Sequence, residues 1–452
     1  YGGTQPPTGL VRRYHLGGVI VMSDNVRSVP AVRRSNEALQ RADHRPWPLF
    51  LGVDQEGGIV ARLGAPMTGF PTLMTYGAAG RRDLMRASAR ASGEELRAAG
   101  FTVVFAPVAD VTTGSSDPTI GSRSVGSRPR RVGRIVTAAL AGYRTSGIAP
   151  VVKHFPGHGS VTTDSHVNLP VQDASMRTLR RRDLVPFRAA FSAGAPVAMI
   201  GHIAVRAVDP GVPATLSRPV VTGLLRKRMG YDGLVVTDAL EMGAIGKGYG
   251  TARAAVLALR AGVDVLLMPA DLPAAHRGIV RGVRSGRLSR ARLEQAATRT
   301  VALLMHQEAA GGPAPPPRVI GGHQPASYQA SKAAVTVVKG RCSGRLVGRG
   351  VSVSGDSSAV RAFRAAARAR GLATSGGTSV RLVGYGASAT SGDVVVSLDT
   401  PYVLGQSRAG TKIAVYGETR GAMRALVDVL VGRARAPGHL PVPVGGVPRR
   451  GC

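Results

Sequence analysis

The stretch FTVVFAPVAD (Phe101–Asp110) carries the pattern from which the fold is predicted. It is a short apolar run that ends in a carboxylate, and continuous Val-rich runs of this length are typical of strands buried in a parallel sheet. Helical patterns such as LMRASARASGEELRAAG separate further runs, so we predict an alternating, parallel α/β fold. The other runs are GGVIVM from Gly17, PLFLGVD from Pro48, APVVKH from Ala149, APVAMIGH from Ala195, GLVVTD from Gly233 and VDVLLMP from Val263.

The number of these runs bears on the type of α/β fold. There are seven strand candidates, one fewer than a (β/α)8 TIM-type barrel needs. The chain begins with Tyr1 rather than Met, and the absent strand would precede GGVIVM. We therefore expect a barrel that lacks its first strand through N-terminal truncation, with an exposed apolar gap between GGVIVM and VDVLLMP. A seven-stranded or open sheet is the alternative.

Polar residues follow the predicted strands and favour the barrel. In a barrel the carboxyl ends of the strands converge on one mouth, where active sites are built. An aspartate after a strand can also cap the next helix, but capping does not account for lysine and histidine at matching places. These strand-end residues are Asp54, Asp110, Lys153 with His154, His202 and Asp238.

A change of composition divides the chain. The segment AAGGPAPPPRVIGGH, from Ala309, is rich in Pro and Gly and is typical of an interdomain linker. Beyond it, strand candidates such as VSVSG and DVVVSLDT alternate with helical patterns such as AVRAFRAAARARG. We predict a catalytic barrel at residues 1–308, a linker at 309–323 and a C-terminal α/β sandwich domain at 324–452.

The formal net charge of +33 raises the question of an anionic partner. The arginines are scattered and aromatic residues are only 4% of the chain, so stacking platforms for single-stranded nucleic acid are few and we expect no nucleic-acid partner. Association with an anionic cell wall or membrane stays open beside an ordinary solvated basic surface. The two cysteines, Cys342 and Cys452, exclude a multi-bridge scaffold and leave a single bridge open.

The stretch KHFPGHGSVTTDSH (Lys153–His166) concentrates titratable groups, and three kinds of site compete for it. A metal site has suitable ligands, but Pro156 and two glycines argue against a helix that would align them, and Lys153 disfavours a cation. A phosphate loop is disfavoured because a long polar loop follows rather than a helix. Acid–base chemistry is the third, since the Asp164 carboxylate can orient the His166 ring and stabilise its charged form. We expect no metal and no cofactor.

KHFPGHG, followed after four residues by DSH, resembles the signature of the β-N-acetylglucosaminidase branch of glycoside hydrolase family three. The pieces GVDQEGGIVARL, FAPVADV, IGSRSVG, PATLS and GLVVTDALEMGAI resemble further family motifs in the same order. The similarity covers roughly residues 15–305, and the C-terminal part is similar to the extra sandwich domain of some members. One departure is Val125, where the family usually has an aromatic residue, and it bears on the packing beside Arg123.

The resemblance implies a role for each matching residue. Asp238 would be the nucleophile that forms a covalent glycosyl-enzyme, and His166, oriented by Asp164, would be the general acid/base. Glu56, Asp110 and His158 are expected to be structural. The implied sugar-binding residues are Asp54, Arg62, Arg123, Lys153 and His154.

The function implied by the resemblance is that of a retaining exo-β-N-acetylglucosaminidase acting on cell-wall muropeptides or similar glycans. A neutral histidine in place of an acidic residue would not repel an anionic second substrate, so phosphorolysis at the same site stays open. A catalytically silent protein that binds the anionic cell wall is the alternative of another class. We expect a monomer, and we favour secretion or the cell envelope over the cytoplasm.

Overall fold

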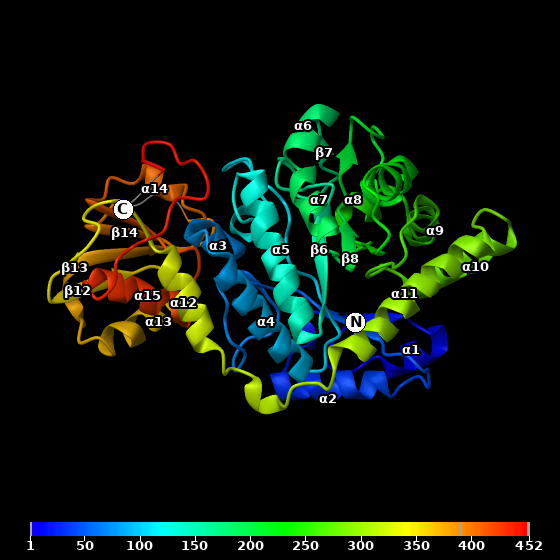
Figure 1. The fold of residues 1–452 in the computed structure, drawn as a ribbon, viewed down its shortest axis with the longest axis horizontal. Coiled ribbons are helices and arrows are strands. Elements are labelled where there is room, and N and C mark those ends of the chain that lie inside the picture. Colours follow the sequence, from blue (N-terminus) through cyan, green and yellow to red (C-terminus); the bar gives the residue numbers. More distant parts are fainter. Residues whose placement is uncertain (1, 388–390, 450–452) are drawn as a thin grey trace.

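The structure is a computed structural model that describes residues 2–387 and 391–449. Two α/β units lie side by side in Figure 1, the N-terminal unit on the right and the C-terminal unit on the left. Each is built around one larger sheet, of six strands in the first unit and five in the second. The described residues also form two small sheets, one from β3 (Gln55–Gly57) and β4 (Val60–Ala61), the other from β7 (Val171–Gln172) and β9 (Ala204–Val205).

The first large sheet is parallel throughout and uses six of the seven predicted strands. The stretch Phe101–Asp110 forms a shorter strand than predicted, because Pro107 has no N–H to donate to a neighbouring strand. Beyond Pro107, a single bridge pairs Val108 with Lys153. In spatial order the strands are β1 (Gly18–Val21), β2 (Phe50–Val53), β5 (Val103–Val104), β6 (Ala149–Phe155), β8 (Val197–Ile200) and β10 (Leu234–Thr237).

This sheet is a curled parallel half-barrel, consistent with the predicted TIM-type fold. The seventh predicted strand, VDVLLMP, adds only a bridge between Val265 and Val236 at the edge of β10. Ile20 of β1 and Leu267 of this last segment belong to one buried cluster and line one cavity, although the two segments lie at opposite edges of the sheet. The sheet therefore curls far enough to bring its first and last segments together.

The predicted exposed apolar gap between GGVIVM and VDVLLMP is wrong. Ile20 and Leu267 are 8% and 9% exposed, and their apolar neighbours in both segments are buried or half-buried. The reason is a long helix, α11 (Arg290–Gly311), whose Leu304 is buried in the same cluster as Ile20 and Leu267. The segment LEQAATRTVALLMHQ within it has a helical pattern, but such a pattern does not tell which surface the helix covers.

Helices connect the strands and bury their apolar stripes against the sheet. α5 (Pro129–Ser146), for example, has Pro129 in its first turn and is followed by Gly147, whose φ of +76° suits a left-handed cap. The helices of the first unit are α1 (Thr8–Tyr14), η1 (Ser23–Asn25), α2 (Val29–Gln40), α3 (Leu73–Ala79), α4 (Arg82–Ala98), η2 (Gly121–Arg123), α5 (Pro129–Ser146), α6 (Met176–Arg181), α7 (Leu184–Ser192), η3 (Ala214–Leu216), the π-helix η4 (Pro219–Arg228), α8 (Gly243–Gly246), α9 (Thr251–Ala261), α10 (Leu272–Arg284) and α11.

The second unit contains a mixed sheet in which only β11 runs antiparallel to its neighbour. Its strands, in spatial order, are β11 (Thr336–Lys339), β15 (Thr411–Ala414), β14 (Val394–Ser397), β13 (Ala373–Val383) and β12 (Gly350–Ser354). Its helices are η5 (Pro317–Val319), α12 (Gln324–Ala334), α13 (Ser357–Arg368), α14 (Val403–Gln406) and α15 (Arg420–Leu430).

The two faces of this second sheet are covered differently. Phe363 of α13 and Leu426 of α15 pack in one cluster with strand residues. A second cluster joins Val395 of β14 to Leu404 of α14 and to Met74 of α3, a helix of the first unit. The chain beyond the predicted linker thus forms an α/β unit that packs on the barrel. Its description as a separate sandwich domain, with the linker at 309–323, stays a prediction.

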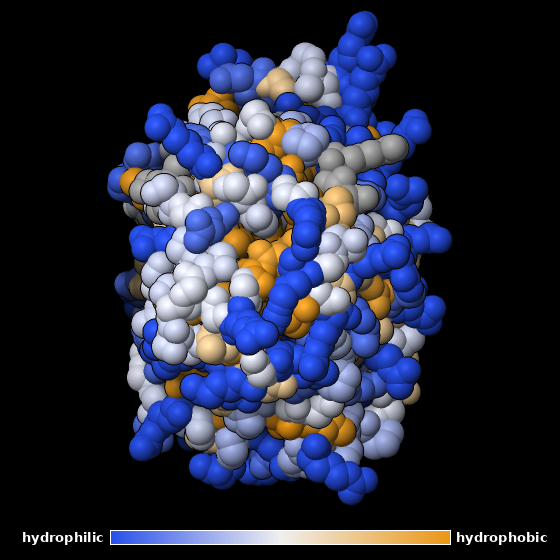
Figure 2. Space-filling model, turned by 90° about the vertical axis from the view of Figure 1, so that its left-hand side faces the viewer, coloured by the Kyte–Doolittle hydropathy of each residue, from blue (hydrophilic) through white to orange (hydrophobic). Residues whose placement is uncertain are grey.

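Figure 2 views the molecule from the side of the second unit, and hydrophilic side chains spread over this face between smaller apolar patches. Within the described ranges, no helix combines the length and apolarity that a membrane span requires. The question of a bridge between Cys342 and Cys452 concerns a residue outside the described ranges.

Candidate active site

A cavity of about 250 Å³ opens where the strands of the first sheet end. β2, β6 and β10 each deliver polar side chains to it from their carboxyl ends, as the strand-end pattern predicted. The cavity gathers every predicted site residue except Asp164, which contacts it through His166. The predicted residues that line it are Asp54, Arg62, Arg123, Lys153, His154, His166 and Asp238.

Glu56 organises the positive charges of the cavity. Its two carboxylate oxygens accept hydrogen bonds from Arg123 Nε at 2.9 Å and Nη2 at 2.8 Å, the paired geometry that suits a guanidinium. Lys153 Nζ lies 2.7 Å from Glu56 Oε1 and donates to Asp54 Oδ1 at the same distance. Arg62 Nη2 lies farther out, 3.7 Å from Asp54 Oδ2. The network joins four of the predicted sugar-binding residues to one carboxylate.

These pairings fix the ionisation of the buried groups. Burial raises the pKa of Glu56, but the charges of Arg123 and Lys153 outweigh it and hold that pKa well below its usual range. Burial lowers the pKa of Lys153, but Asp54 and Glu56 outweigh it and raise that pKa above its usual value. The carboxylate of Glu56 and the ammonium of Lys153 are therefore charged at neutral pH.

Asp110 orients the histidines of the KHFPGHG motif. It is fully buried, and its Oδ2 lies 2.7 Å from His154 Nδ1 while its Oδ1 accepts the backbone N–H of His158 at 2.7 Å. Burial raises the pKa of Asp110, but His154 and His158 together lower it by more, so the carboxylate is ionised and can only accept. His154 Nδ1 therefore donates to Asp110, and its Nε2 faces Arg123 Nη2 at 3.5 Å. Burial, aided by His154, lowers the pKa of His158 to about 4, so His158 is neutral.

Asp238 follows the last residue of β10 and is half-buried at the cavity wall. Its backbone N–H donates to Ile200 O at 3.0 Å and its Oδ1 accepts the Ala239 N–H at 2.8 Å, which together fix the turn after the strand. Burial raises the pKa of Asp238, but His154, His202 and the Ala239 N–H lower it by more, so that pKa lies below its usual value. Asp238 is an ionised carboxylate in a pocket, the state that a nucleophile requires.

His202 supports this turn from behind. It is fully buried, its Nε2 donates to Ala239 O at 2.9 Å, and its Nδ1 lies 2.7 Å from Thr215 Oγ1. The sequence singled out His202 as a strand-end residue but gave it no part in the site. Its contacts with the segment that carries Asp238 explain its position.

Asp164 and His166 form an exposed pair at the cavity mouth. His166 Nδ1 lies 2.7 Å from Asp164 Oδ1, which also accepts the backbone N–H of His166 at 2.9 Å. The side chain of His166 is 62% exposed and that of Asp164 is 37% exposed. Burial raises the pKa of Asp164, but the two bonds from His166 lower it by more, so Asp164 is ionised and accepts from Nδ1–H. The other ring nitrogen, Nε2, is left for chemistry in the cavity.

The backbone on both sides of the His166 ring is anchored. The N–H groups of Gly243 and Ala244, in α8, donate to the carbonyl oxygens of His166 and Ser165 at 3.1 and 3.3 Å. Ser165 Oγ lies 2.9 Å from His158 Nε2, which joins this loop to the buried motif. Because α8 begins five residues after Asp238, these bonds tie the two ends of the cavity wall together.

The structure adds apolar residues that the sequence analysis did not identify as part of the site. Their signal was weak, because an apolar side chain that lines a cavity does not differ in sequence from one of the core. The larger apolar residues that line the cavity are Ile20, Met22, Val60, Ile120, Met199, Met242, Leu267 and Met268.

The second unit contacts the loop that carries Arg123. Ser122 Oγ donates to the Asp399 carboxylate, and Tyr385 Oη donates to Pro118 O at 3.4 Å. The backbone N–H of Ser127 donates to Pro441 O at 3.2 Å. Val125, the departure from the family pattern, is fully buried in the same loop. The C-terminal unit therefore holds a loop of the site although none of its residues lines the cavity among those described.

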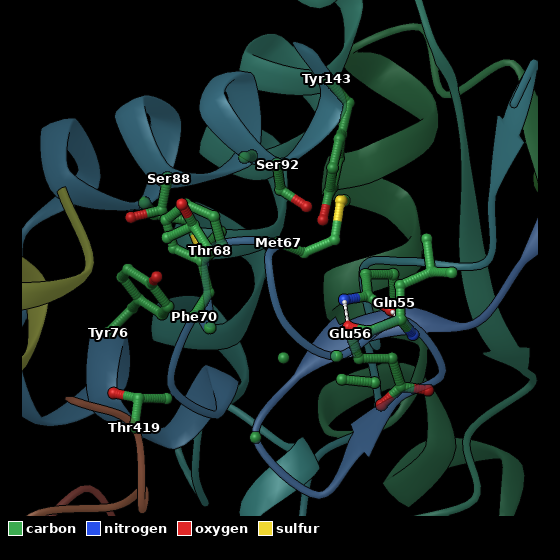
Figure 3. Close-up of a pocket in the computed structure, with 18 of the residues that line it drawn as sticks. Gln55, Glu56, Met67, Thr68, Phe70, Tyr76, Ser88, Ser92, Tyr143 and Thr419 are labelled. Carbon is green, nitrogen blue, oxygen red and sulfur yellow. Dashed lines mark hydrogen bonds between the residues drawn. The ribbon is translucent and has the colours of Figure 1, made fainter. Parts of the chain in front are cut away.

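A second cavity, of about 180 Å³, lies beside the backbone of Glu56 (Figure 3). The hydroxyls of Tyr76, Ser88, Ser92 and Tyr143 line it, and neither histidine nor lysine nor arginine does among the residues described. The Glu56 carboxylate is bound to Arg123 and Lys153, which line the first cavity. The acid–base and ionic groups thus gather in the first cavity.

Comparisons with known proteins point to one family. The family model described as Glycosyl hydrolase family 3 N terminal domain matches residues 5–303. Beta-hexosaminidase A of Pseudoalteromonas piscicida is 36% identical over 287 residues, which are 59% of this chain and 48% of that protein, so the chain spans about half the length of this relative.

Two solved structures are similar to different extents of the chain. A family 3 β-N-acetylglucosaminidase from Paenibacillus sp. str. FPU-7 is similar over 98% of this chain and 97% of its own, with a TM-score of 0.88 and 29% identity. A glycosyl hydrolase of the same family from Mycobacterium smegmatis is 34% identical and covers 67% of this chain and 94% of its own, with a TM-score of 0.61.

Proposed function

The chain belongs to glycosyl hydrolase family 3 and is a glycoside hydrolase, and from this premise we propose that it is a retaining exo-β-N-acetylglucosaminidase. The observation that carries the proposal is the meeting of Asp238 and His166 in one cavity with Asp54, Lys153 and His154. The proposed substrates are terminal β-linked N-acetylglucosamine residues of cell-wall muropeptides or related glycans. The relatives' names, which refer to hexosaminidases and to a β-N-acetylglucosaminidase, support this class of sugar.

In the first step, a carboxylate oxygen of Asp238 attacks the anomeric carbon and the glycosidic C–O bond breaks. The leaving oxygen takes the proton of His166 Nε2. Asp164 accepts the Nδ1–H throughout, and its negative charge stabilises the imidazolium form of the ring before this transfer. In the second step a water attacks the anomeric carbon, gives its proton to Nε2, and the ester bond to Asp238 breaks. Two displacements at one carbon retain its configuration.

The buried network is proposed to bind the sugar. Lys153 and Arg123 present N–H donors to the cavity from fixed positions, His154 lines it beside them, and Asp54 and Arg62 add an acceptor and a donor at its edge. Since these groups are held by Glu56 and Asp110 rather than by the sugar, little ordering is needed on binding. Such preorganisation suits a site that places the anomeric carbon next to Asp238.

A phosphorylase using the same site is the second candidate. The observation that favours it is the acid/base itself, because a histidine that is neutral at the second step does not repel an anionic acceptor as a carboxylate would. Phosphate would then replace water in the second step, and the product would be a sugar phosphate rather than a free sugar.

The test is turnover of 4-nitrophenyl N-acetyl-β-D-glucosaminide with and without added phosphate. We expect release of free N-acetylglucosamine in the β configuration at a rate that phosphate does not change, and no loss with a chelator. A sugar phosphate as the main product would show that the protein is a phosphorylase rather than a hydrolase. Absence of any turnover by the folded protein would favour the silent protein bound to an anionic cell wall.

A further inference from the structure

A groove of about 670 Å³ lies between η4, α9 and the start of α11, in the part of the first unit that faces away from the second unit in Figure 1. It shares no lining residue with the active cavity. Of the described residues that line it, none is acidic and seven are basic. The basic residues are Arg218, Arg226, Lys227, Arg260, Arg287, Arg292 and Arg299.

The floor of the groove carries fixed positive charge. Asp264 is a buried carboxylate with three guanidinium partners, Arg226 and Arg292 at 2.7 Å and Arg299 at 3.4 Å. Arg226 and Arg292 are also tied to backbone carbonyls, those of Tyr231 at 3.1 Å and of Leu259 at 3.0 Å. One negative charge faces three positive ones, so the floor keeps an excess of positive charge. The bonds to Asp264 and to the carbonyls hold the arginine side chains in place.

The rim of the groove adds four exposed cations, which are Arg218, Lys227, Arg260 and Arg287. None of the four forms an ion pair with any residue in the ranges 2–387 and 391–449. Ser289, the N-cap of the 22-residue helix α11, lines the same groove, and the first turn of this helix contains no acidic residue. The positive end of the helix dipole therefore adds to the side-chain charge.

From this arrangement we propose that the groove binds a flexible anionic polymer of repeated phosphate groups. Six of the seven cations are arginines, whose planar forks match the oxygens of a phosphate in pairs. The volume exceeds that of the sugar cavity and admits several anionic groups at once. The negatively charged phosphate oxygens supply the ion-pair partners that the four rim cations lack among the described residues.

Other anionic partners fit the groove less well. No aromatic side chain is among the described lining residues, so bases of a nucleic acid would find no stacking surface. None of the large exposed hydrophobic residues among those described belongs to the groove, and a hollow surface meets a flat bilayer poorly. A thin, flexible polyanion can follow the hollow and reach both rim and floor.

The position of the groove separates attachment from catalysis. Asp264 Oδ2 accepts the N–H of Val235 near the beginning of β10, whereas Asp238 follows the end of the same strand. A polymer held at Asp264's end of the strand leaves the mouth of the barrel open to a glycan. The groove would thus keep the protein on an anionic matrix while the active cavity works on its substrate.

The test measures binding of sodium polyphosphate, as the probe, to two variants that each lose four positive charges. The groove variant carries Arg218→Gln, Lys227→Gln, Arg260→Gln and Arg287→Gln; the matched control carries Arg361→Gln, Arg364→Gln, Arg368→Gln and Arg408→Gln on the second unit. Thermal melting of both verifies the fold, and turnover of the chromogenic sugar, whose cavity contains none of these residues, is compared with the parent protein.

At about 0.1 M salt we expect the groove variant to bind polyphosphate at least about tenfold more weakly than the parent protein does. The slope of log K against the logarithm of the salt concentration should become shallower by about three. The control should change less than about threefold, and both should keep turnover. Equal weakening of both variants would overturn the proposal, as would binding of phosphatidylglycerol vesicles without binding of polyphosphate. Because binding is measured without substrate, its outcome does not depend on the proposed glycosidase activity.

Discussion

The two halves of the active cavity differ in burial more than in chemistry. One half is the network around Glu56, in which the side chains of Glu56, Lys153 and Arg123 are 2%, 3% and 11% exposed and all are ion-paired. The other half is the pair of Asp164 and His166, with side chains 37% and 62% exposed. Both halves are built from carboxylates paired with nitrogen bases, yet the second is far more open to solvent.

This difference matches the work proposed for each half. The opposite charges around Glu56 and Lys153 hold both ionised in spite of burial, so the network offers unchanging donors and acceptors to a sugar. A group that gives and takes protons has to reach the leaving oxygen and then a water, and the exposed ring of His166 can do both. Asp238 lies between them, with its turn held by His202 from behind and by Ile200 from β8.

Loss of the nucleophile should have the largest effect. Asp238→Asn keeps the shape of the side chain but removes the charge that attacks the anomeric carbon, and we expect kcat to fall about 10⁴-fold or more. The exposed, neighbouring Asp232→Asn is the control and should leave kcat unchanged. Steady-state kinetics on the chromogenic sugar measure both, and a fully active Asp238→Asn would remove this carboxylate from the mechanism.

Loss of the exposed half should depend on the leaving group. For His166→Ala we expect a fall of about 10²- to 10⁴-fold on alkyl glycosides, whose leaving oxygen needs a proton, and a smaller fall in the glycosylation of nitrophenyl glycosides, whose leaving oxygen does not. His15→Ala is a matched control, because His15 also faces an aspartate, Asp43, at an exposed site far along the chain. Equal losses on both classes of substrate would contradict the acid role.

Loss of the centre of the buried half should affect binding and stability together. Glu56→Gln leaves Lys153 and Arg123 buried without one counter-charge, and we expect KM to rise and the free energy of unfolding to fall by about 3 kcal/mol. The exposed pair partner Glu37→Gln should cost less than about 0.5 kcal/mol. Denaturant unfolding and kinetics of the same samples test both parts, and a variant with unchanged KM and stability would contradict the network's role.

The same variant gives a pH test. The pKa of Glu56 is lowered by folding, so its charge stabilises the folded state above the usual pKa of glutamate and this contribution is lost as pH falls toward the lowered value. The difference in the free energy of unfolding between the parent protein and Glu56→Gln should therefore be largest at neutral pH and should decrease below about pH 4. A difference that grows on acidification would reverse the assigned direction of the shift.

The smallest expected effect comes from the second unit. Asp399→Asn weakens the bond to Ser122, next to Arg123, and we expect KM to rise about fivefold, equivalent to about 1 kcal/mol, with kcat little changed. The control is Asp393→Asn, in the same unit, whose bonds to Ser379 do not reach the loop. If both variants have the KM of the parent protein, the second unit does not position Arg123.

Sequence reasoning found the residues at strand ends because strand polarity brings them together whatever the details of packing. Asp54, Lys153, His154 and Asp238 lie where that rule puts them. It did not find the centre of the network, because Glu56 meets Arg123 across 67 positions of sequence and no local pattern encodes that pairing. The expected gap beside VDVLLMP was likewise wrong, since the surface that α11 covers depends on tertiary packing.

Known structures are similar to different extents of the chain. The Mycobacterium smegmatis structure corresponds to 67% of this chain, whereas the Paenibacillus structure corresponds to 98%. The bond from Asp399 to Ser122 crosses between the units at residues 277 positions apart. The sequence predicted a second α/β unit from its own strand pattern, but its contact with the site depends on how the units pack.

The central claim is that Asp238 forms a covalent bond with the sugar while His166 moves the protons. Peptide mapping by mass spectrometry of His166→Ala, quenched during turnover of a nitrophenyl N-acetylglucosaminide, tests it most directly. Without the base for the second step the glycosyl-enzyme should accumulate, and we predict one N-acetylhexosamine on the peptide that contains Asp238. An adduct on another residue, or continued hydrolysis with no adduct at all, would contradict the account.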